Sequence, residues 1–172
     1  RRTNLARLEL AEGDEIIGFN VLAVPDLSTS LDGHLGEKQA ALSSGGISVE
    51  DIRTLGDAGL VISVGDSMQT CAAALQKKNP AIRHQHFSHL QGIEAADQLA
   101  ELLLAETGFS RPNASVVRWR KRLQDAMLDS HFSLGQSRFL VVAEPDQIAG
   151  ICQSLYDAGG KVTVAISSVD SP

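Results

Sequence analysis

Short apolar runs that stop at a breaker residue recur along the chain and predict buried β-strands. They lie in FNVLAVPDLS (residues 19–28), AGLVISVG (58–65) and RFLVVAEPD (138–146). Apolar runs of this length, without polar alternation, are typical of strands buried on both faces, as in a parallel sheet.

Helical patterns fill the intervals between these runs. Ser48 is a candidate N-cap for a short helix, and Gly59 supplies its stop. Gly108 closes a strong helical pattern. The three patterns occupy residues 47–59, 66–80 and 94–108. Helices that alternate with strands indicate an α/β fold in which right-handed crossovers join parallel strands.

The two ends of the sequence suggest a piece of a larger protein. Residues 137–168 form one compact strand, helix, strand unit, which cannot bury its own apolar faces. Residues 4–17 form a weaker helix candidate, interrupted by Gly13, with no preceding strand to pack on. We therefore expect a longer parent chain.

A long amphipathic helix is predicted from Val116 onward. Its apolar positions fall within one sector of the helix, which we expect to face the core. They are Val116, Trp119, Leu123, Ala126, Met127 and Leu134. The opposite side carries Arg118, Arg122, Asp125 and Asp129. Within this charged stripe, Arg122 is expected to pair with Asp125 one turn further on.

The end of this helix raises a question of chemistry. The stretch RLQDAMLDSHFSLG (122–135) places two carboxylates four residues apart, with a histidine beside them. On a continuous helix the side chains of Asp129 and His131 point about 200° apart and cannot share a metal ion. If the helix instead ends near Asp129, His131 falls in its last turn, where the helix dipole favours a cation. We interpret the group as one that ends and docks the helix.

Composition and charge limit the classes of function. The chain has 172 residues and a net charge of -6, which argues against non-specific nucleic-acid binding. No apolar run reaches the roughly 18 residues of a membrane span, and no signal peptide is apparent, so we expect a soluble, cytoplasmic protein. Cys71 and Cys152 are too few and too far apart for a disulfide framework or a four-thiolate cluster site. We expect Cys71 to be a small buried residue.

A histidine cluster is a further candidate for metal binding. His84, His86 and His89 lie close together, and His84 and His86 would share one face of an extended chain. No carboxylate or thiolate stands at a supporting spacing. We therefore favour a solvated or interfacial loop there.

Two glycine-containing or acidic segments mimic known binding loops. Residues 26–37 have the acidic spacing of a calcium loop, but Leu31 stands where the sharp turn requires Gly, so calcium is rejected. Gly45 and Gly46 could cradle an anion ahead of the Ser48 helix, although they match no phosphate-binding fingerprint. A loop that leads into the helix is the favoured interpretation.

Five segments, in one order along nearly the whole chain, carry a resemblance to a known family. They are PDLSTSLDGHL (25–35), GGISVEDI (45–52), FSHLQGIEAAD (87–97), RLQDAMLDSHFSLG (122–135) and AEPDQIAG (143–150). On these segments the chain resembles the nitrogenase component-one superfamily, and within it the scaffold subunits on which the iron–molybdenum cofactor precursor matures.

The resemblance implies a fold and a domain arrangement. Family subunits have three Rossmann-like domains, in which parallel sheets are flanked by helices. By this likeness residues 1–108 are an incomplete middle domain, residues 109–135 a connecting long helix, and residues 136–172 the first βαβ unit of a third domain. The family's N-terminal domain, with the cysteine that helps to hold an iron–sulfur cluster, has no counterpart here. Neither Cys71 nor Cys152 matches that cysteine motif.

The resemblance also implies partners and cargo. The subunit would pair with a homologous NifE-like subunit in an α2β2 heterotetramer that holds an iron–sulfur cluster and the iron–molybdenum cofactor precursor. It would be an assembly scaffold and not an enzyme, with no catalytic, cofactor-binding or metal residue in this chain. The residues expected at interfaces are Asp26, Asp32, His34, Asp129 and His131.

Two alternatives remain open at this stage. One is an enzymatic subunit, either the β subunit of the nitrogenase molybdenum–iron protein or its relative in dark-operative protochlorophyllide reductase. The β subunit typically follows a related DSH element with a Trp-containing run, whereas this chain has DSHFSLG (129–135), which favours the scaffold. The other alternative is a Rossmann-like small-molecule-binding module that uses Gly45 and Gly46 or the histidine cluster.

Overall fold

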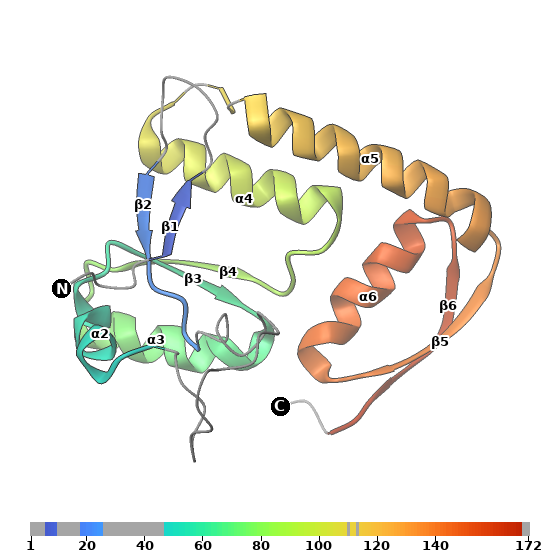
Figure 1. Cartoon of the computed structure of the whole chain (residues 1–172). Helices are drawn as coiled ribbons and strands as arrows, with labels where there is room; N and C mark the ends of the chain where they lie inside the picture. The colour runs from blue at the N-terminus through green and yellow to red at the C-terminus, as the bar shows by residue number, and fades with distance from the viewer. Residues whose placement is uncertain (1–5, 10–17, 26–46, 110, 113, 170–172) are drawn as a thin grey trace, which may run out of the picture.

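The computed structural model describes residues 6–9, 18–25, 47–109, 111–112 and 114–169. Within them, short parallel sheets are flanked by helices (Figure 1), which confirms the predicted α/β fold class. The calcium-like loop, the Gly45–Gly46 pair and three of the expected interface residues, Asp26, Asp32 and His34, lie outside the described residues.

The first sheet differs from the prediction. Strand β1 (Ala6–Glu9) pairs antiparallel with β2 (Gly18–Val21), with Ala6 opposite Val21. The helix expected over residues 4–17 is therefore wrong at residues 6–9. The reason is visible in the sequence, because apolar and charged residues alternate there with the period of two that a strand requires. Residues 18–21 form a strand as predicted, but in an antiparallel pair and not in a parallel sheet.

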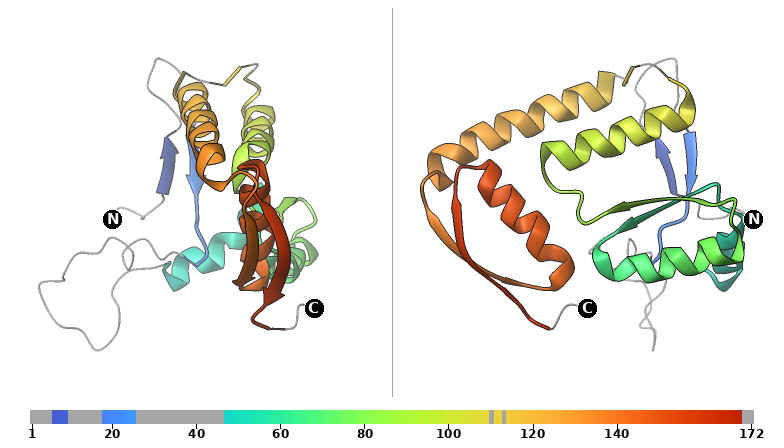
Figure 2. Two further views of the ribbon diagram at one scale, coloured as in Figure 1. Left: turned by 90° about the vertical axis from the view of Figure 1, so that its right-hand side faces the viewer. Right: turned by 180° about the vertical axis from the view of Figure 1, so that it is seen from behind.

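A parallel pair of strands organises the middle of the chain. Strand β3 (Leu60–Val64) pairs with β4 (Arg83–Phe87), and the pair lies between helices α3 (Gln69–Lys78) and α4 (Gly92–Thr107), as Figures 1 and 2 show. Strand β3 was predicted. Strand β4 shows that the loop expected around the histidines is wrong. The polar residues of this segment gave no strand pattern, and the buried side chains of Ile82 and Phe87 attach it to the core.

The predicted helix ends at Ser48 and Gly108 are confirmed, whereas the helix that begins after Ser48 ends at Thr54, before the stop expected at Gly59. Ser48 caps α2 (Val49–Thr54), its Oγ accepting from the N–H of Asp51 at 3.0 Å. The chain then passes through a short 3₁₀ helix, η1 (Leu55–Asp57), into β3. Gly108 ends α4 in the left-handed conformation, at φ 73°.

Helix α5 (Ala114–Leu134) lies beside α4, and the ion pair of Arg120 with Asp97 joins them at 2.7 Å (Figure 1). The prediction of which side of α5 faces the core is only partly correct. Trp119 is 58% exposed and stacks under the Arg122 guanidinium, whose Cζ lies 4.6 Å from the ring centroid. No described residue of α5 is fully buried.

The last unit is the predicted βαβ. Strand β5 (Arg138–Ala143) pairs parallel with β6 (Lys161–Ser167), and α6 (Pro145–Asp157) packs on one face of the pair. The other face is open in the described part of the chain, where exposed apolar side chains from both strands gather. They are Leu140, Val142, Val164 and Ile166.

Cys71 also corrects an expectation. It lies exposed on α3, whereas its neighbour Ala72 is buried. A helix presents consecutive residues about 100° apart, so only one of the two can face the sheet.

Candidate functional site

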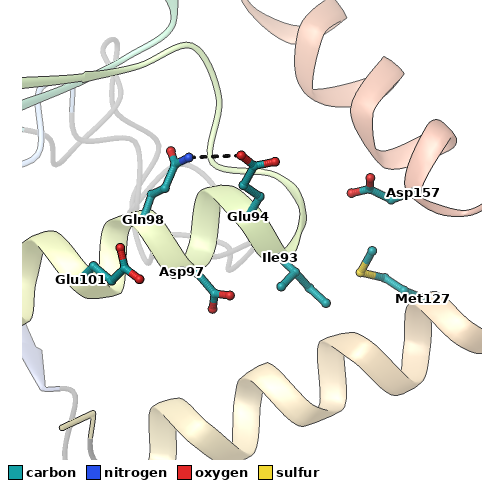
Figure 3. Close-up of a pocket in the computed structure, with 7 residues that line it drawn as sticks. All are labelled: Ile93, Glu94, Asp97, Gln98, Glu101, Met127 and Asp157. Carbon is teal, nitrogen blue, oxygen red and sulfur yellow. Dashed lines mark hydrogen bonds between the residues drawn. The ribbon is translucent and has the colours of Figure 1, made fainter.

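An acidic groove lies where α4, α5 and α6 meet. Its volume is about 510 Å³, and Figure 3 shows its side chains arriving from all three helices. The lining residues are Ile93, Glu94, Asp97, Gln98, Glu101, Met127 and Asp157. Arg120 donates a hydrogen bond to Asp97 and thereby lowers the pKa of that carboxyl. The remaining carboxylates give the groove its negative charge.

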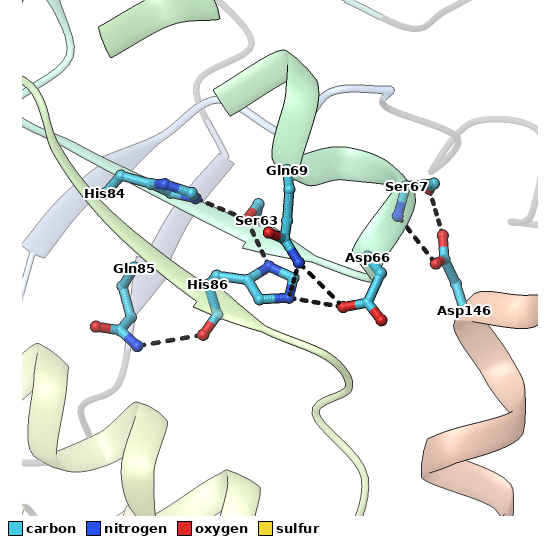
Figure 4. Close-up of polar contacts among 8 residues, drawn as sticks. All are labelled: Ser63, Asp66, Ser67, Gln69, His84, Gln85, His86 and Asp146. Atoms are coloured by element: carbon cyan, nitrogen blue, oxygen red, sulfur yellow. Dashed lines mark hydrogen bonds and ion pairs between the residues drawn. The ribbon is translucent and has the colours of Figure 1, made fainter. Parts of the chain in front are cut away.

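A polar cluster is built around Ser63, the only polar residue of β3. Its Oγ lies 2.8 Å from Nε2 of His84 and 2.9 Å from Nδ1 of His86 (Figure 4). His84 and His86 reach the same side because they are two residues apart on β4. Ser63 is buried, at 6% exposure, so its hydroxyl finds its hydrogen-bond partners inside the protein.

Asp66 sets the order of protons in this cluster. It opens the 3₁₀ helix η2 (Asp66–Met68), and its Oδ1 lies 2.9 Å from Nε2 of His86. Gln69 Nε2 lies 3.1 Å from Nε2 of His86 and also donates to Asp66 Oδ1 at 3.2 Å. A carboxylate only accepts, so with the Gln69 amide bonded to Asp66, a neutral His86 carries its proton on Nε2 and accepts at Nδ1 from the Ser63 hydroxyl. The Ser63 oxygen then accepts from Nε2–H of His84. The result is a directed chain from His84 through Ser63 and His86 to Asp66.

Ser63, His86 and Asp66 lie at the carboxyl ends of β3 and β4, the edge where open α/β sheets bind their ligands, whereas His84 is the second residue of β4. A cavity of about 470 Å³ opens beside it and is lined by Asp66, Gln69 and His86, among others. The cluster resembles a Ser/His/Asp set in composition. Its hydroxyl, however, is buried beneath two imidazoles, so it is not placed to attack a substrate.

A second polar contact joins η2 to α6. Ser67 donates to the Asp146 carboxylate from its backbone N–H at 3.1 Å and also from its hydroxyl (Figure 4). The Ser67 hydroxyl, followed by its N–H, lowers the pKa of Asp146. Gly65 allows this approach, because a Cβ there would lie 2.7 Å from Cγ of Asp146.

The structure places two of the expected interface residues on α5. Asp129 and His131 are exposed, and the helix continues past both to Leu134, so they do not share a metal site. His131 lies in the last turn, and its ring occupies the space beside Gly159 in the turn between α6 and β6. His131 therefore docks the helix end as predicted, while its role at an interface stays a prediction.

The predicted ion pair of the charged stripe is absent. Arg122 stacks on Trp119, and the Arg or Lys ion pairs between described residues join Arg83 to Glu106 and Arg120 to Asp97. Arg118, Asp125 and Asp129 have no polar partner among the described residues.

The described residues do not offer a ligand set for a metal cluster. They contain no group of three or more His, Cys, Asp or Glu side chains suited to a metal ion. Cys71 and Cys152 are unpaired and lie on different helices. An iron–sulfur cluster requires several thiolates, so no ligand role is derived for either residue.

Sequence reasoning missed Ser63, Asp66 and Asp146. Ser63 gave a signal, as a lone hydroxyl within the apolar run LVISV (60–64). Asp66 and Asp146 also gave a signal, because each follows a predicted strand and the carboxyl ends of parallel strands lie at one edge of a sheet. Their pairing depends on how the units pack, which local patterns do not encode.

Comparison with known proteins places the chain among nitrogenase-related sequences. The family model "Nitrogenase component 1 type Oxidoreductase" matches residues 16–172. The chain is 33% identical over 167 residues, 95% of its length and 37% of the relative, to "Nitrogenase iron-molybdenum cofactor biosynthesis protein NifN" of Nostoc sp.. It is 36% identical over 157 residues, 91% of its length and 33% of the relative, to the protein of the same name in Bradyrhizobium diazoefficiens.

A more distant relative of the same name, from Klebsiella pneumoniae, is 30% identical over 148 residues, or 84% of the chain. The chain thus spans about a third of the length of the curated relatives it matches. None of the helices in the described ranges has the length and apolar character that crossing a bilayer requires.

Proposed function

The chain belongs to the nitrogenase component 1 type oxidoreductase family, and we propose that it is part of a scaffold subunit for nitrogenase iron–molybdenum cofactor biosynthesis. The observation that carries the proposal is similarity over most of the chain to relatives that bear the NifN name. Family membership alone would leave catalytic and assembly subunits equally possible.

The structural features of the described residues support an assembly role. Apolar side chains on β5 and β6 remain uncovered, and so does one side of α5. Parallel sheets are normally covered on both faces, so these surfaces fit contact with further protein, either from the same subunit or from a partner. The Ser63 hydroxyl, the best candidate for a nucleophile in the polar cluster, is buried.

The finer parts of the proposal concern arrangement and partner. We infer that residues 1–108 belong to a middle Rossmann-like domain, that residues 109–135 connect it to the next, and that residues 136–172 begin a third domain. The parent protein would pair with a NifE-like subunit in an α2β2 heterotetramer in the cytoplasm. The iron–molybdenum cofactor precursor would be its cargo, and the cluster ligands would come from outside this chain.

A binding module is a second candidate, favoured by the 470 Å³ cavity at the carboxyl edge of β3 and β4. In that case a small molecule would bind the chain without a partner subunit. The β subunit of the molybdenum–iron protein is the third possibility, and it would pair with a nitrogenase α subunit.

Affinity purification from anaerobic nitrogen-fixing cells distinguishes these functions. The tagged protein would be the native-length gene product that carries this sequence, followed by mass spectrometry and by iron and molybdenum analysis. The scaffold proposal expects a NifE-like partner and bound iron. A nitrogenase α subunit in the complex, or a solitary metal-free protein, would contradict it.

A further inference from the structure

The two hydrogen bonds of the Ser63 hydroxyl can run in either direction. A ring nitrogen of histidine is a donor or an acceptor according to where the proton sits, and a hydroxyl can be both at once. Ser63 Oγ lies between Nε2 of His84 and Nδ1 of His86, at 2.8 Å and 2.9 Å (Figure 4). The buried hydroxyl can therefore donate to either ring while it accepts from the other.

The surroundings of His86 satisfy both orders of protons. In the order described above, Nε2 of His86 donates to Asp66, and the amide nitrogen of Gln69 donates to the same carboxylate. In the reverse order, His86 carries its proton on Nδ1 and leaves Nε2 as an acceptor. The Gln69 amide lies 3.1 Å from that Nε2 and can then donate to it. Both orders thus leave Ser63 and His86 with partners on each side.

We propose that Ser63 relays protons between His84 and His86, and that this relay ends at Asp66 on the wall of the cavity of about 470 Å³. Asp66 is two-thirds exposed, with a side-chain exposure of 67%, so it can exchange a proton with a molecule in the cavity. The relay makes the cavity an acid–base site. It depends only on this cluster and holds whether or not the parent protein is a scaffold.

One proton enters and one proton leaves in each passage along the relay. A proton binds Nδ1 of His84, and the Nε2 proton of that ring moves to the Ser63 oxygen. The Ser63 hydroxyl proton moves to Nδ1 of His86, and the Nε2 proton of His86 moves to Oδ1 of Asp66. Each group in between gains one proton and loses one, so both rings end neutral with their protons on Nδ1. The opposite sequence carries a proton from Asp66 to His84.

Carboxylates favour the charged state of the relay at its His86 end. Nε2 of His86 lies 2.9 Å from Asp66, whereas His84 has no carboxylate within ion-pair distance in the described part of the chain. The described residues that line the cavity include no lysine or arginine. The other titratable groups that face His86, from β4, the segment after it, α4 and α6, are His84, His89, Glu94, Asp146 and Asp157. We therefore expect the first proton taken up to rest on Nδ1 of His86.

Uptake of that proton must also change His84. A protonated Nδ1 of His86 donates to the Ser63 oxygen, so the hydroxyl turns and donates to Nε2 of His84. His84 then stays neutral but carries its own proton on Nδ1. Charging both rings together is opposed by their repulsion, because the ring centroids are 6.5 Å apart. If the hydroxyl were a fixed structural acceptor for both rings, His84 would instead keep its proton on Nε2.

Nitrogen-15 NMR of the histidine rings tests the relay in the native-length protein that carries this chain. The spectra are recorded in the solid state from about pH 8 to about pH 5, the range in which histidines titrate. His84→Gln and His86→Gln assign the two rings by the loss of their signals. As His86 gains its proton, His84 should change from the Nε2–H to the Nδ1–H tautomer with the same midpoint. Independent changes at the two rings, a His84 that keeps its proton on Nε2 while His86 is charged, or two rings that stay neutral would each overturn the relay.

Variants of the hydroxyl separate a relay from a shared environment. Ser63→Ala should abolish the linked change at His84, and Ser63→Thr, which keeps a hydroxyl, should restore it. Ser88→Ala removes an exposed hydroxyl from the cavity wall and should leave the linked change intact. A linked change that persists in Ser63→Ala, or that a folded Ser63→Thr protein lacks, would rule out Ser63 as the carrier. Circular dichroism melting curves check folding, and the wild-type titration is decisive even if a variant at this buried site fails to fold.

Discussion

A single hydroxyl organises the polar site of this protein. Ser63 is the one residue of β3 that can satisfy two ring nitrogens at once, and its burial leaves it no other partners. The histidines were visible in the sequence and their shared face was predicted. The proton order was not predictable, because it depends on Asp66, which joins the cluster from a different element.

Replacing Ser63 by Ala should remove the fixed order of protons in the cluster. We expect the wild-type rings of His84 and His86 to carry their protons on Nε2, and the substitution to remove that preference at His84. The loss of a buried hydrogen-bond partner should lower the free energy of unfolding by about 1 kcal/mol. Nitrogen-15 NMR of the rings and urea unfolding measure the two effects. Ser88→Ala, at an exposed serine, is the control, and an unchanged His84 tautomer in the Ser63 variant would contradict the assignment.

Two carboxylates make the packing of the units sensitive to acid. The pKa of Asp146 is lowered by Ser67 and that of Asp97 by Arg120, both from 3.8. A lowered pKa in the folded state means that the stabilising effect is complete above the unfolded value and is lost as the pH falls through the folded one. Stability should therefore decline below about pH 4. In Asp146→Asn the decline should be smaller, as urea unfolding across this range would show.

The control for that experiment is Asp57→Asn, which removes an exposed carboxylate without a hydrogen-bond partner among the described residues. If both variants lost stability on acidification as steeply as the wild type, the Ser67 contact with Asp146 would not couple folding to pH.

At the scale of elements, the end of α5 is fixed by its contact with the turn before β6. Gly159 has φ 79°, and the His131 ring fills the space that a Cβ would need. Gly159→Ala should lower the free energy of unfolding by at least about 1 kcal/mol, since it combines backbone strain with a steric clash. Chemical denaturation measures the loss.

Gly59→Ala is the matched control for this turn, because nothing lies within 4 Å of a Cβ there and its φ is not positive. Adding His131→Ala to Gly159→Ala should recover the steric part of the loss and leave the backbone part. No recovery would show that the ring is not what limits the turn.

Elements with a clear hydrophobic period or a capping residue could be predicted from the sequence. Elements that depend on contacts with other parts of the chain could not. The strand at residues 60–64, the βαβ unit and the caps at Ser48 and Gly108 follow from local patterns. The strand at residues 83–87 was missed because it lacks an apolar run: its histidines bind Ser63 and do not pack in an apolar core. Trp119 was placed in the core because helical periodicity does not show that Arg122 stacks on it at the surface.

At the scale of the whole molecule, polar contacts join the described units. Ser67 with Asp146 and Asp97 with Arg120 hold neighbouring units together, while apolar surface on α5 and on the β5–β6 pair stays exposed. Polar contacts between units permit relative movement. The uncovered apolar surfaces are where further protein would pack.

The central proposal is that the parent protein takes part in maturing a cofactor precursor and is not the subunit that reduces substrate. Acetylene reduction by the anaerobically purified, native-length assembly, supplied with a reductase component and reductant, tests this directly. We predict no reduction by the assembly alone, and reduction only after its cargo has passed to a separately purified cofactor-free nitrogenase component. Acetylene reduction by the assembly itself would contradict the account and assign the chain to a catalytic subunit.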